Sequence, residues 1–331
     1  MRMSLVTAGA VAIGVALAAV TVSSGGGAAV GATPSCRGDH ITVASLASGC
    51  AVSSGTVVLP DGRRFTVPPV GTTVQALPVA ASGAGDPGDV SLTNTGRAGL
   101  AVRVDDHWSG SPAAVRQERA AVQHRNAALG STSGAATTTA TTSAPSSCSN
   151  KTYTRLGVRW ASRVDWRYNA TGQKVAGVTA IRAGADAWTG ALSSCGKKVA
   201  STASDRYLGT ATEAPGVTAA GGCGSSSGTS VAGWGSLRSG TLAVTCVWSR
   251  SGVAVEVDER YSTAVAWSVS TTCTGTRFDL RGVATHEWGH GFGLGHTAQS
   301  SGLVMKPAST TCETGQRTLG LGDLMGIDAL Y

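Results

Sequence analysis

Three histidines and a glutamate lie close together near the C-terminus of the chain. His286 and His290 are four residues apart, so on a helix they would lie on one face, about one turn apart, and could hold one metal ion. Glu287 would then be near enough to contact a water on that ion without being a ligand. Gly293 can end the helix in a backbone conformation that other residues avoid, which lets the chain turn back and present His296 as a third ligand. Three nitrogen ligands and one open position typify a catalytic zinc site rather than a structural one.

The residues form the pattern H-E-x-x-H-x-x-G-x-x-H, which resembles the zinc signature of the metzincin metalloproteases. A purely structural histidine pair is the alternative, but it needs a coincidence of five fixed positions. Met305 follows in Leu303–Pro307 and resembles the methionine turn that lies beneath the zinc in this family. Its short distance from His296 resembles the matrixin branch.

The flanking segments resemble the matrixins as well. Phe278–Leu280 and Val283-Ala284 resemble the run into the active-site helix, and Asp323–Ile327 with Leu330-Tyr331 resembles the C-terminal helix. The resemblance covers roughly residues 150–331 and is dense after about residue 240. It implies an α+β fold, in which a twisted mixed sheet carries an active-site helix and a C-terminal helix. A small, mainly β N-terminal region precedes this domain.

The resemblance implies a secreted zinc endopeptidase with one catalytic zinc ion. Glu287 would act as the general base toward a water that zinc activates. An extended protein or peptide substrate would add as a strand at Leu242 and Ala243, within a segment that resembles the substrate-binding edge strand of matrixins. Pro307 and the two residues after it would wall the main side-chain pocket.

One departure from the vertebrate matrixins concerns their second, structural zinc. A histidine follows the Leu-Ala pair in those enzymes, whereas Val244 stands here, and the other histidines of the chain all precede the predicted linker. A structural zinc built from histidines is therefore excluded from the second domain. Calcium is less clear: Glu256, Asp258 and Asp205 offer oxygen ligands, but their spacing resembles no known calcium loop, and hydrogen bonding or surface exposure explains them better.

The start of the chain predicts export. Residues 1–32 read as a signal peptide, with Arg2, an apolar run and a small-residue cleavage site at Val30–Ala32. An uncleaved anchor is the alternative, because the run is near the minimum spanning length. Once the signal is cleaved we expect no membrane insertion, and the net charge of +7 is too dispersed to indicate nucleic acid. We expect a monomer.

Eight cysteines fit an oxidising destination, and none forms a C-x-x-C pair. Cys36 and Cys50 are expected to pair with each other. The other six allow many pairings, of which we favour Cys148–Cys195, Cys223–Cys246 and Cys273–Cys312.

The chain divides into an N-terminal accessory or propeptide region (33–130), a Ser/Thr/Ala-rich linker (131–147) and the catalytic domain (148–331). The expected strands are 56–59, 63–67, 164–168, 241–248 and 253–257, and the expected helices are 112–130, 175–192 and 280–292.

How the enzyme is kept latent has three candidate answers. Matrixin proenzymes block zinc with a cysteine, and Cys36-Arg37-Gly38-Asp39 is distantly similar to that motif, but the residue order differs and Cys50 is a ready partner. Residues 33–130 could instead cover the cleft as an inhibitory domain, or bind a cell wall or polymer. Rival functions are a zinc amidohydrolase on non-peptide substrates and a non-catalytic adhesin, although the adhesin has no need of Glu287.

Overall fold

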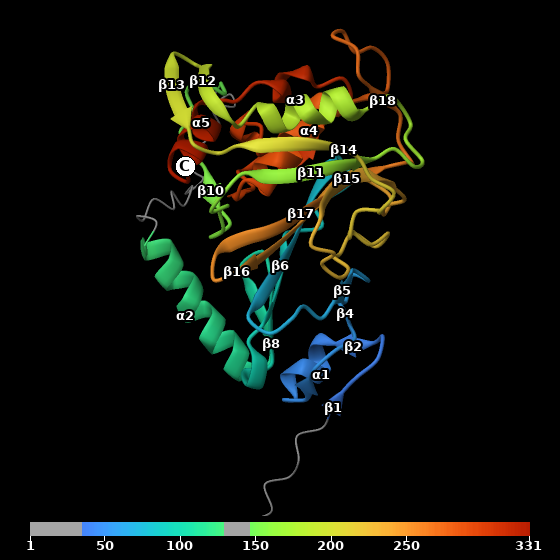
Figure 1. Cartoon of the computed structure of the whole chain (residues 1–331), viewed down its shortest axis with the longest axis vertical. Coiled ribbons are helices and arrows are strands. Elements are labelled where there is room, and N and C mark those ends of the chain that lie inside the picture. The colour runs from blue at the N-terminus through green and yellow to red at the C-terminus, as the bar shows by residue number, and fades with distance from the viewer. Residues whose placement is uncertain (1–34, 129–145) are drawn as a thin grey trace, which may run out of the picture. The chain divides into compact units, whose positions relative to one another are not determined.

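This computed structural model describes residues 35–128 and 146–331. Both stretches contribute strands to one ten-stranded sheet (Figure 1). Residues 1–32, the expected signal peptide, and residues 131–145 of the expected linker lie outside the described part of the chain. The strand order is β14-β11-β15-β17-β16-β6-β7-β8-β9, and β21 pairs with β6. The sheet therefore passes from the C-terminal region into the N-terminal region between β16 and β6.

The C-terminal part of the sheet is mostly parallel. Strands β14, β11, β15 and β17 are parallel neighbours, and β16 is antiparallel to β17. Helices α3 and α4 lie side by side on one face of this part (Figure 1). Gly184 allows their close approach, because a Cβ there would lie 2.6 Å from the Ala284 carbonyl carbon. The bounds are β11 Val164–Asn169, β14 Asp205–Thr210, β15 Ser230–Gly235, β16 Thr241–Arg250, β17 Val253–Ser262, α3 Val178–Asp186 and α4 Leu280–Gly291.

The N-terminal part of the sheet is an antiparallel meander. Its first strand, β6, pairs antiparallel with β16 from Thr72↔Arg250 to Ala80↔Thr241. Alternate apolar side chains of β6 face opposite sides of the sheet, as expected for a strand that is covered on both faces. The bounds are β6 Thr72–Ala81, β7 Val90–Asn94, β8 Leu100–Val104, β9 His107–Gly110 and α2 Pro112–Ala128.

Smaller elements complete the described residues. The helices are α1 Val43–Ala47 and α5 Leu321–Asp328; the 3-10 turns are Gly96–Ala98, Gln299–Ser301 and Thr314–Arg317. The short strands are β1 Ser35–Cys36, β2 Ile41–Thr42, β3 Ala51–Val52, β4 Thr56–Val58, β5 Arg64–Thr66, β10 Thr154–Arg155, β12 Gly190–Ser194, β13 Lys197–Ser201, β18 Trp267–Ser268, β19 Phe278–Asp279, β20 Leu294–Gly295 and β21 Ala308–Ser309. No described helix is long and apolar enough to cross a membrane.

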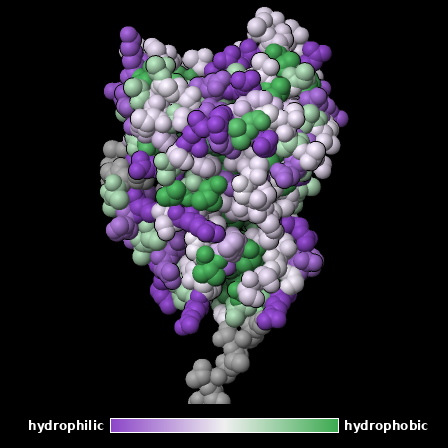
Figure 2. All heavy atoms as spheres, in the orientation of Figure 1, coloured by the Kyte–Doolittle hydropathy of each residue, from purple (hydrophilic) through white to green (hydrophobic). Residues whose placement is uncertain are grey.

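Two apolar cores are packed against the sheet. The larger core surrounds α3 and α4 and includes Trp166 and Trp288, whose rings lie 5.0 Å apart. The smaller core belongs to the N-terminal meander, yet it includes Val244 and Trp248 of β16. Strand β16 thus buries one face in each core. On the face shown in Figure 2, apolar side chains form small groups among polar ones.

The expected α+β class agrees with this mixed architecture, but one expected helix is wrong. The helix predicted over 175–192 is α3, which spans only Val178–Asp186. Gly190 has a φ of +71° and starts β12, which pairs with β13 through a turn at Cys195. Apolar periodicity continues past residue 186, but the strand pairing of β12 overrides it.

All four expected disulfides are present: Cys36–Cys50, Cys148–Cys195, Cys223–Cys246 and Cys273–Cys312. Cys223–Cys246 ties the loop before β15 to the middle of β16. Cys148–Cys195 ties the start of the C-terminal region to the β12–β13 turn.

Candidate metal centre

Helix α4 carries the first two histidines, and hydrogen bonds of Asp279 hold its N-terminus in place. Its N-cap is Asp279, whose carboxylate accepts the backbone N–H of Gly282 at 2.6 Å. The same carboxylate accepts a hydrogen bond from Arg317 Nε at 2.9 Å. Trp288 and Phe292 are buried in the larger core, as expected for side chains that fix the helix on the sheet.

The chain reverses directly after α4 to bring in the third histidine. Gly293 has a φ of +102°, and its N–H donates to the carbonyl of His290 at 2.9 Å. A Cβ at this position would collide with the carbonyl oxygen of Val158. Gly293 is therefore required both for its backbone conformation and for the close approach of the neighbouring chain, and His296 follows from it.

The three imidazoles converge on one point. Nε2 of His296 lies 3.1 Å from Nε2 of His286 and 3.2 Å from Nε2 of His290. Ligands of a tetrahedral zinc at about 2.0–2.1 Å would be about 3.3–3.4 Å apart, so the spacing suits this ion. Within the described residues, these three are the group of metal-binding side chains that could hold an ion.

The tautomers of His286 and His290 also favour a cation bound between the rings. Nδ1 of His286 donates to the carbonyl of Val304, and Nδ1 of His290 donates to the carbonyl of Leu294, both at 2.8 Å. Each bond places the proton on Nδ1 and leaves a lone pair on Nε2. Burial, and then the nearby His296, lowers the pKa of His286 to about 3 and that of His290 well below its usual value, so both rings are neutral. Converging lone pairs repel one another unless a metal ion lies between them.

Glu287 is fully buried beside the triad. Its Oε2 accepts a hydrogen bond of 2.5 Å from Thr245 Oγ1, and no described residue donates to its Oε1. Burial raises the pKa of Glu287 well above its usual value, and the nearby carboxylates of Glu259 and Asp89 raise it further. A carboxylate with one oxygen fixed and the other unpartnered is suited to accept a proton from a small molecule at the triad.

Met305 lies directly beneath the helix. Its side chain is buried, and a Cβ on Gly289 would overlap the Met305 sulfur. Asp323 of α5 holds this turn, since its carboxylate accepts the N–H of Val304 at 3.0 Å. Burial raises the pKa of Asp323 to about 6.

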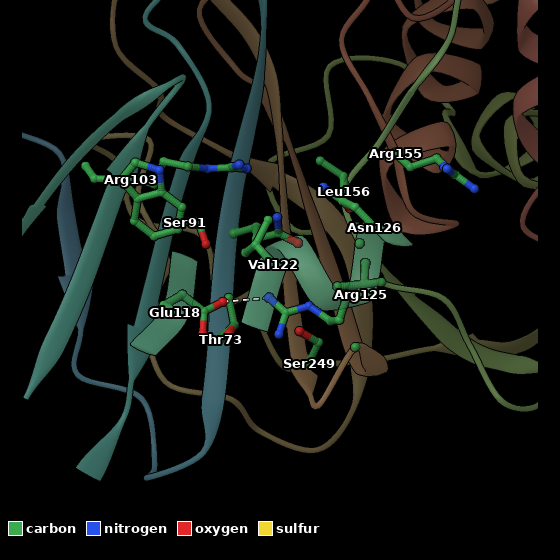
Figure 3. A pocket seen from close by; sticks show the side chains of 15 residues that line it. Thr73, Ser91, Arg103, Glu118, Val122, Arg125, Asn126, Arg155, Leu156 and Ser249 are labelled. Atoms are coloured by element: carbon green, nitrogen blue, oxygen red, sulfur yellow. Dashed lines mark hydrogen bonds and ion pairs between the residues drawn. The ribbon is translucent and has the colours of Figure 1, made fainter. Parts of the chain in front are cut away.

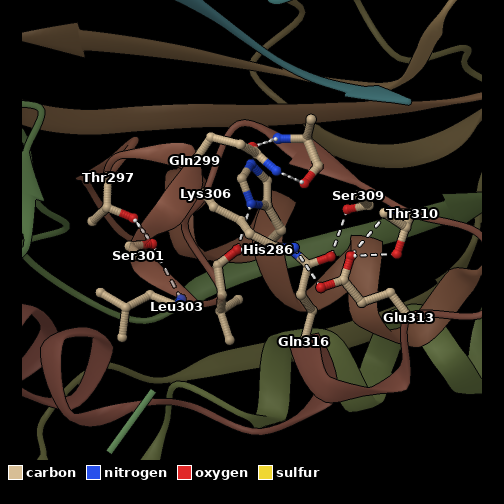
Figure 4. A network of polar contacts seen from close by, with 12 residues as sticks. His286, Thr297, Gln299, Ser301, Leu303, Lys306, Ser309, Thr310, Glu313 and Gln316 are labelled. Carbon is tan, nitrogen blue, oxygen red and sulfur yellow. Dashed lines mark hydrogen bonds and ion pairs between the residues drawn. The ribbon is translucent and has the colours of Figure 1, made fainter. Parts of the chain in front are cut away.

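A polar network joins the turn to the segment after it (Figure 4). Gln316 Nε2 donates to the Val304 carbonyl at 3.0 Å, the same carbonyl that fixes His286. Lys306, which is buried, forms an ion pair with Glu313. The network therefore supports the ring orientation of His286 from below.

Replacing Glu313 by glutamine is expected to lower the free energy of unfolding by about 1–3 kcal/mol near pH 7, because the buried Lys306 loses its half-buried ion-pair partner. Burial raises the pKa of Glu313, but Lys306 and Thr310 outweigh it and the net pKa is lowered from 4.5. A lowered folded-state pKa stabilises above the unfolded value and is lost as pH falls through the folded value. Urea unfolding at about pH 7 and about pH 3.5 should show the difference shrinking in acid.

The exposed Glu213→Gln is the matched control and should match the unchanged protein at both pH values. An equal loss for Glu313→Gln at both pH values would contradict an electrostatic origin.

The expected substrate residues lie on the two sides of β6. Leu242 and Ala243 are in β16, which is paired with β17 on one side and with β6 on the other. Pro307 precedes β21, and its carbonyl accepts the N–H of Ala80 in β6 at 3.0 Å. Thus the strand expected to be an open edge is covered in this structure by the N-terminal region.

Two residues at the site were not predicted from the sequence. Thr245 contacts Glu287 from β16, and Asp89 lies before β7 with Oδ1 3.0 Å from Nδ1 of His296. Both come from distant parts of the chain and match no spacing motif. The β-alternation of β16 could have placed Thr245 on the face of α4, but nothing local could have found Asp89.

The expected calcium ligands have other partners. Glu256 accepts the N–H groups of Ser227 and Gly228 at 2.9 and 2.7 Å, and Asp258 accepts those of Gly216 and Val231 at 2.6 and 2.7 Å. They thereby fix the loop between β14 and β15. Asp205 accepts a bond of 2.7 Å from Trp166 Nε1. Calcium at these residues stays an untested prediction.

A small cavity of about 40 Å³ lies beside α2 (Figure 3). It is lined by residues of α2, strands β6 to β9, β10, β16 and the segment around Gly157. The ion pair of Glu118 and Arg125, at 2.6 Å, lies on its wall. None of its lining residues belongs to the histidine site.

Comparison with protein families points to one class. Residues 238–331 match the family model described as Matrixin (Peptidase_M10). The matched stretch contains β16, the three histidines, Met305 and α5. A comparison with curated proteins finds no match. The family match and the histidine triad together support a matrixin-like metalloprotease with a catalytic zinc.

Proposed function

We propose that the chain is a secreted zinc-dependent endopeptidase of the matrixin type. The observation that carries this proposal is the convergence of three imidazole Nε2 atoms beside the unpartnered oxygen of Glu287, within the segment that matches the matrixins. His286, His290 and His296 would hold the ion. Bound there, zinc supplies Lewis acidity toward a water and toward a peptide carbonyl.

Glu287 has the role of general base and acid. Its unpartnered Oε1 accepts a proton from the attacking water, while Thr245 holds Oε2 in place. Glu287 then passes the proton to the leaving amine. Burial favours the protonated carboxyl, so Glu287 can hold the proton between these two transfers. Met305 supports the histidines from below.

The proposed substrate is an extended polypeptide. It binds between Leu242-Ala243 of β16 and the segment that starts at Pro307, with backbone hydrogen bonds on both sides. Backbone pairing selects for extended conformation more than for sequence, and one side-chain pocket adds preference.

The remaining assignments are proposals too. Residues 1–32 act as a signal peptide, 33–130 as a propeptide and 131–147 as the linker between propeptide and enzyme. Four disulfides are consistent with a secreted protein.

Removing the metal should abolish peptide hydrolysis. The full chain, with a site-specific protease sequence inserted within residues 131–145 and then cut, is assayed on casein. Hydrolysis should disappear with a chelator and return when zinc is added. Hydrolysis that survives complete removal of metal would contradict the proposal. Bound zinc without hydrolysis of casein or of a peptide library, at any dilution, would do so as well and would favour a binding role.

A further inference from the structure

The three histidines of the candidate metal centre differ in what holds Nδ1, the ring nitrogen that faces away from the ion site. Nδ1 of His286 donates to the carbonyl of Val304, and Nδ1 of His290 donates to the carbonyl of Leu294, both at 2.8 Å. Both carbonyls belong to the C-terminal region. For Nδ1 of His296, no described residue of that region supplies an acceptor. Two of the three ring orientations are therefore set within the C-terminal region, and the third is not.

The group beside Nδ1 of His296 is the carboxylate of Asp89, which comes from the N-terminal region. Its Oδ1 lies 3.0 Å from this nitrogen. The Nε2 atoms of the three rings converge on the other side, so Asp89 approaches His296 from the side opposite the ion site. A carboxylate in this place is a frequent partner of a metal-binding imidazole, because it fixes the ring orientation and raises the basicity of the ligand nitrogen.

The Asp89 oxygen has no other partner. Within the described residues Oδ1 is buried and accepts no hydrogen bond, since its contact with His296 lies off the line of the N–H bond. A buried carboxylate oxygen without a donor costs free energy. A small tilt of the His296 ring would turn the contact into a hydrogen bond. A cation at Nε2 favours that bond, because it makes the Nδ1–H a stronger donor.

The backbone that carries Asp89 is held firmly. The N–H of Asp89 donates to the Asp105 carboxylate, and the N–H of Asp105 donates to the Asp89 carbonyl, both at 2.8 Å. Arg63, which is 2% exposed, donates to the carbonyls of Pro87 and Gly88 at 2.7 and 2.5 Å. These bonds fix the position from which the carboxylate reaches His296, so the contact is preorganised.

The neighbouring acidic residues do not make this contact. Asp86 and Asp106 are exposed, and Oδ1 of Asp86 accepts the N–H of Gly88 at 2.8 Å. Asp105 is occupied by the N–H of Asp89. Among these acidic residues it is Asp89 that contacts an imidazole of the triad.

We propose that Asp89 is a positioning residue of the metal centre: through this carboxylate the N-terminal region orients His296 and raises the zinc affinity of the whole chain. The inference rests on the proposed function for the presence of zinc at the triad, but not for peptide hydrolysis. Asp89 itself does not contact the substrate or the reacting atoms.

A coupling of this kind is reciprocal. If the docked N-terminal region raises the zinc affinity by some factor, bound zinc strengthens the docking of that region by the same factor. The metal and the N-terminal region therefore stabilise each other, and a chain that has lost the N-terminal region binds zinc more weakly.

Zinc affinity tests the inference without any assay of activity. The full, uncut chain is titrated with zinc in competition with a chromogenic chelator. Asp89→Ala should bind zinc about 10–100-fold more weakly than wild type. Asp89→Asn should lie between the two, because its side-chain oxygen can still accept a hydrogen bond. Asp86→Asn is the matched control: it removes the same charge from the same loop, keeps the acceptor for Gly88, and should bind zinc as wild type does.

Cobalt reports on the orientation of the ligand. With Co²⁺ in place of zinc, the visible absorption of Asp89→Ala should shift from that of wild type, whereas Asp86→Asn should keep the wild-type spectrum. If Asp89 served the stability of its loop alone, its removal would lower the free energy of unfolding of the metal-free chain and leave zinc affinity and the cobalt spectrum unchanged.

Equal zinc affinity for wild type and Asp89→Ala, with circular dichroism unchanged, would overturn the inference. An equal loss in Asp86→Asn would do so too, because it would assign the effect to net charge and not to the contact with His296. If Asp89→Ala does not fold, Asp89→Asn decides: weaker zinc binding than Asp86→Asn supports the inference, and equal binding contradicts it. If zinc affinity depends on Asp89 but the cut chain hydrolyses no peptide, the proposed function fails and the role of Asp89 stands.

Discussion

Glu287→Gln is expected to lower kcat for peptide hydrolysis by about 10²–10⁴-fold, with zinc affinity unchanged. Glutamine keeps the shape of the side chain and can still accept the Thr245 hydrogen bond, but it cannot take a proton from water. The loss should therefore lie in kcat and not in KM. Steady-state kinetics of the cut, diluted chain, together with zinc content by mass spectrometry, measure both.

Thr245→Val tests the role of Glu287 by a milder change. It removes the 2.5 Å hydrogen bond to Oε2 and leaves the carboxylate in place, so a loss of about 10-fold is expected. Thr241→Val, buried on the same strand, is the matched control and should be nearly silent. If Glu287→Gln retained most of the activity, another group would have to be the base.

Gly293→Ala is expected to lower the free energy of unfolding by about 2–5 kcal/mol and the zinc affinity by about 10–100-fold. The φ of +102° is strained for alanine, and the added Cβ meets the carbonyl of Val158. Relief of that collision shifts the turn that delivers His296. Thermal unfolding with and without zinc, and competition with a chromogenic chelator, measure the two effects.

Gly190→Ala separates the cost of the positive φ from the cost of the contact with Val158. Gly190 also has a positive φ, +71°, but a Cβ there meets no atom within 4 Å, so a cost of about 1–2 kcal/mol and an unchanged zinc affinity are expected. Similar losses of stability and of zinc affinity in both variants would mean that the contact with Val158 does not matter.

The parts of the site that could be predicted from the sequence are the local ones. The spacing from His286 to His296 determines a helix, a glycine reversal and three converging rings, because each step involves neighbours in the chain. Strands 164–168 and 241–248 were predicted close to their observed bounds, since β-branched and aromatic residues alternate there. The strand predicted over 253–257 starts at the expected residue but continues to Ser262. The disulfide pairs were also predicted correctly.

Long-range pairing could not be predicted. The strand beside β16 is β6, which lies about 170 residues earlier in the chain, and the Val- and Ala-rich sequence of β6 fits many partners. Asp89 is one of many acidic loop residues, and only the tertiary fold brings it to His296. The end of α3 was missed because a glycine with positive φ and a disulfide outweigh helix periodicity.

The position of β6 has a consequence for the solubility of the protein. With β6 in place, the outer strands of the large sheet are β14 and β9, which are six and four residues long. Without β6, the outer strand would be β16, which is ten residues long and has Val244 and Trp248 on one face. Long apolar edge strands with unpaired backbone groups form hydrogen bonds with strands of other chains and so promote aggregation. A form of the protein without β6 beside β16 would expose this long apolar strand, whereas the observed pairing with β6 keeps its backbone groups bonded.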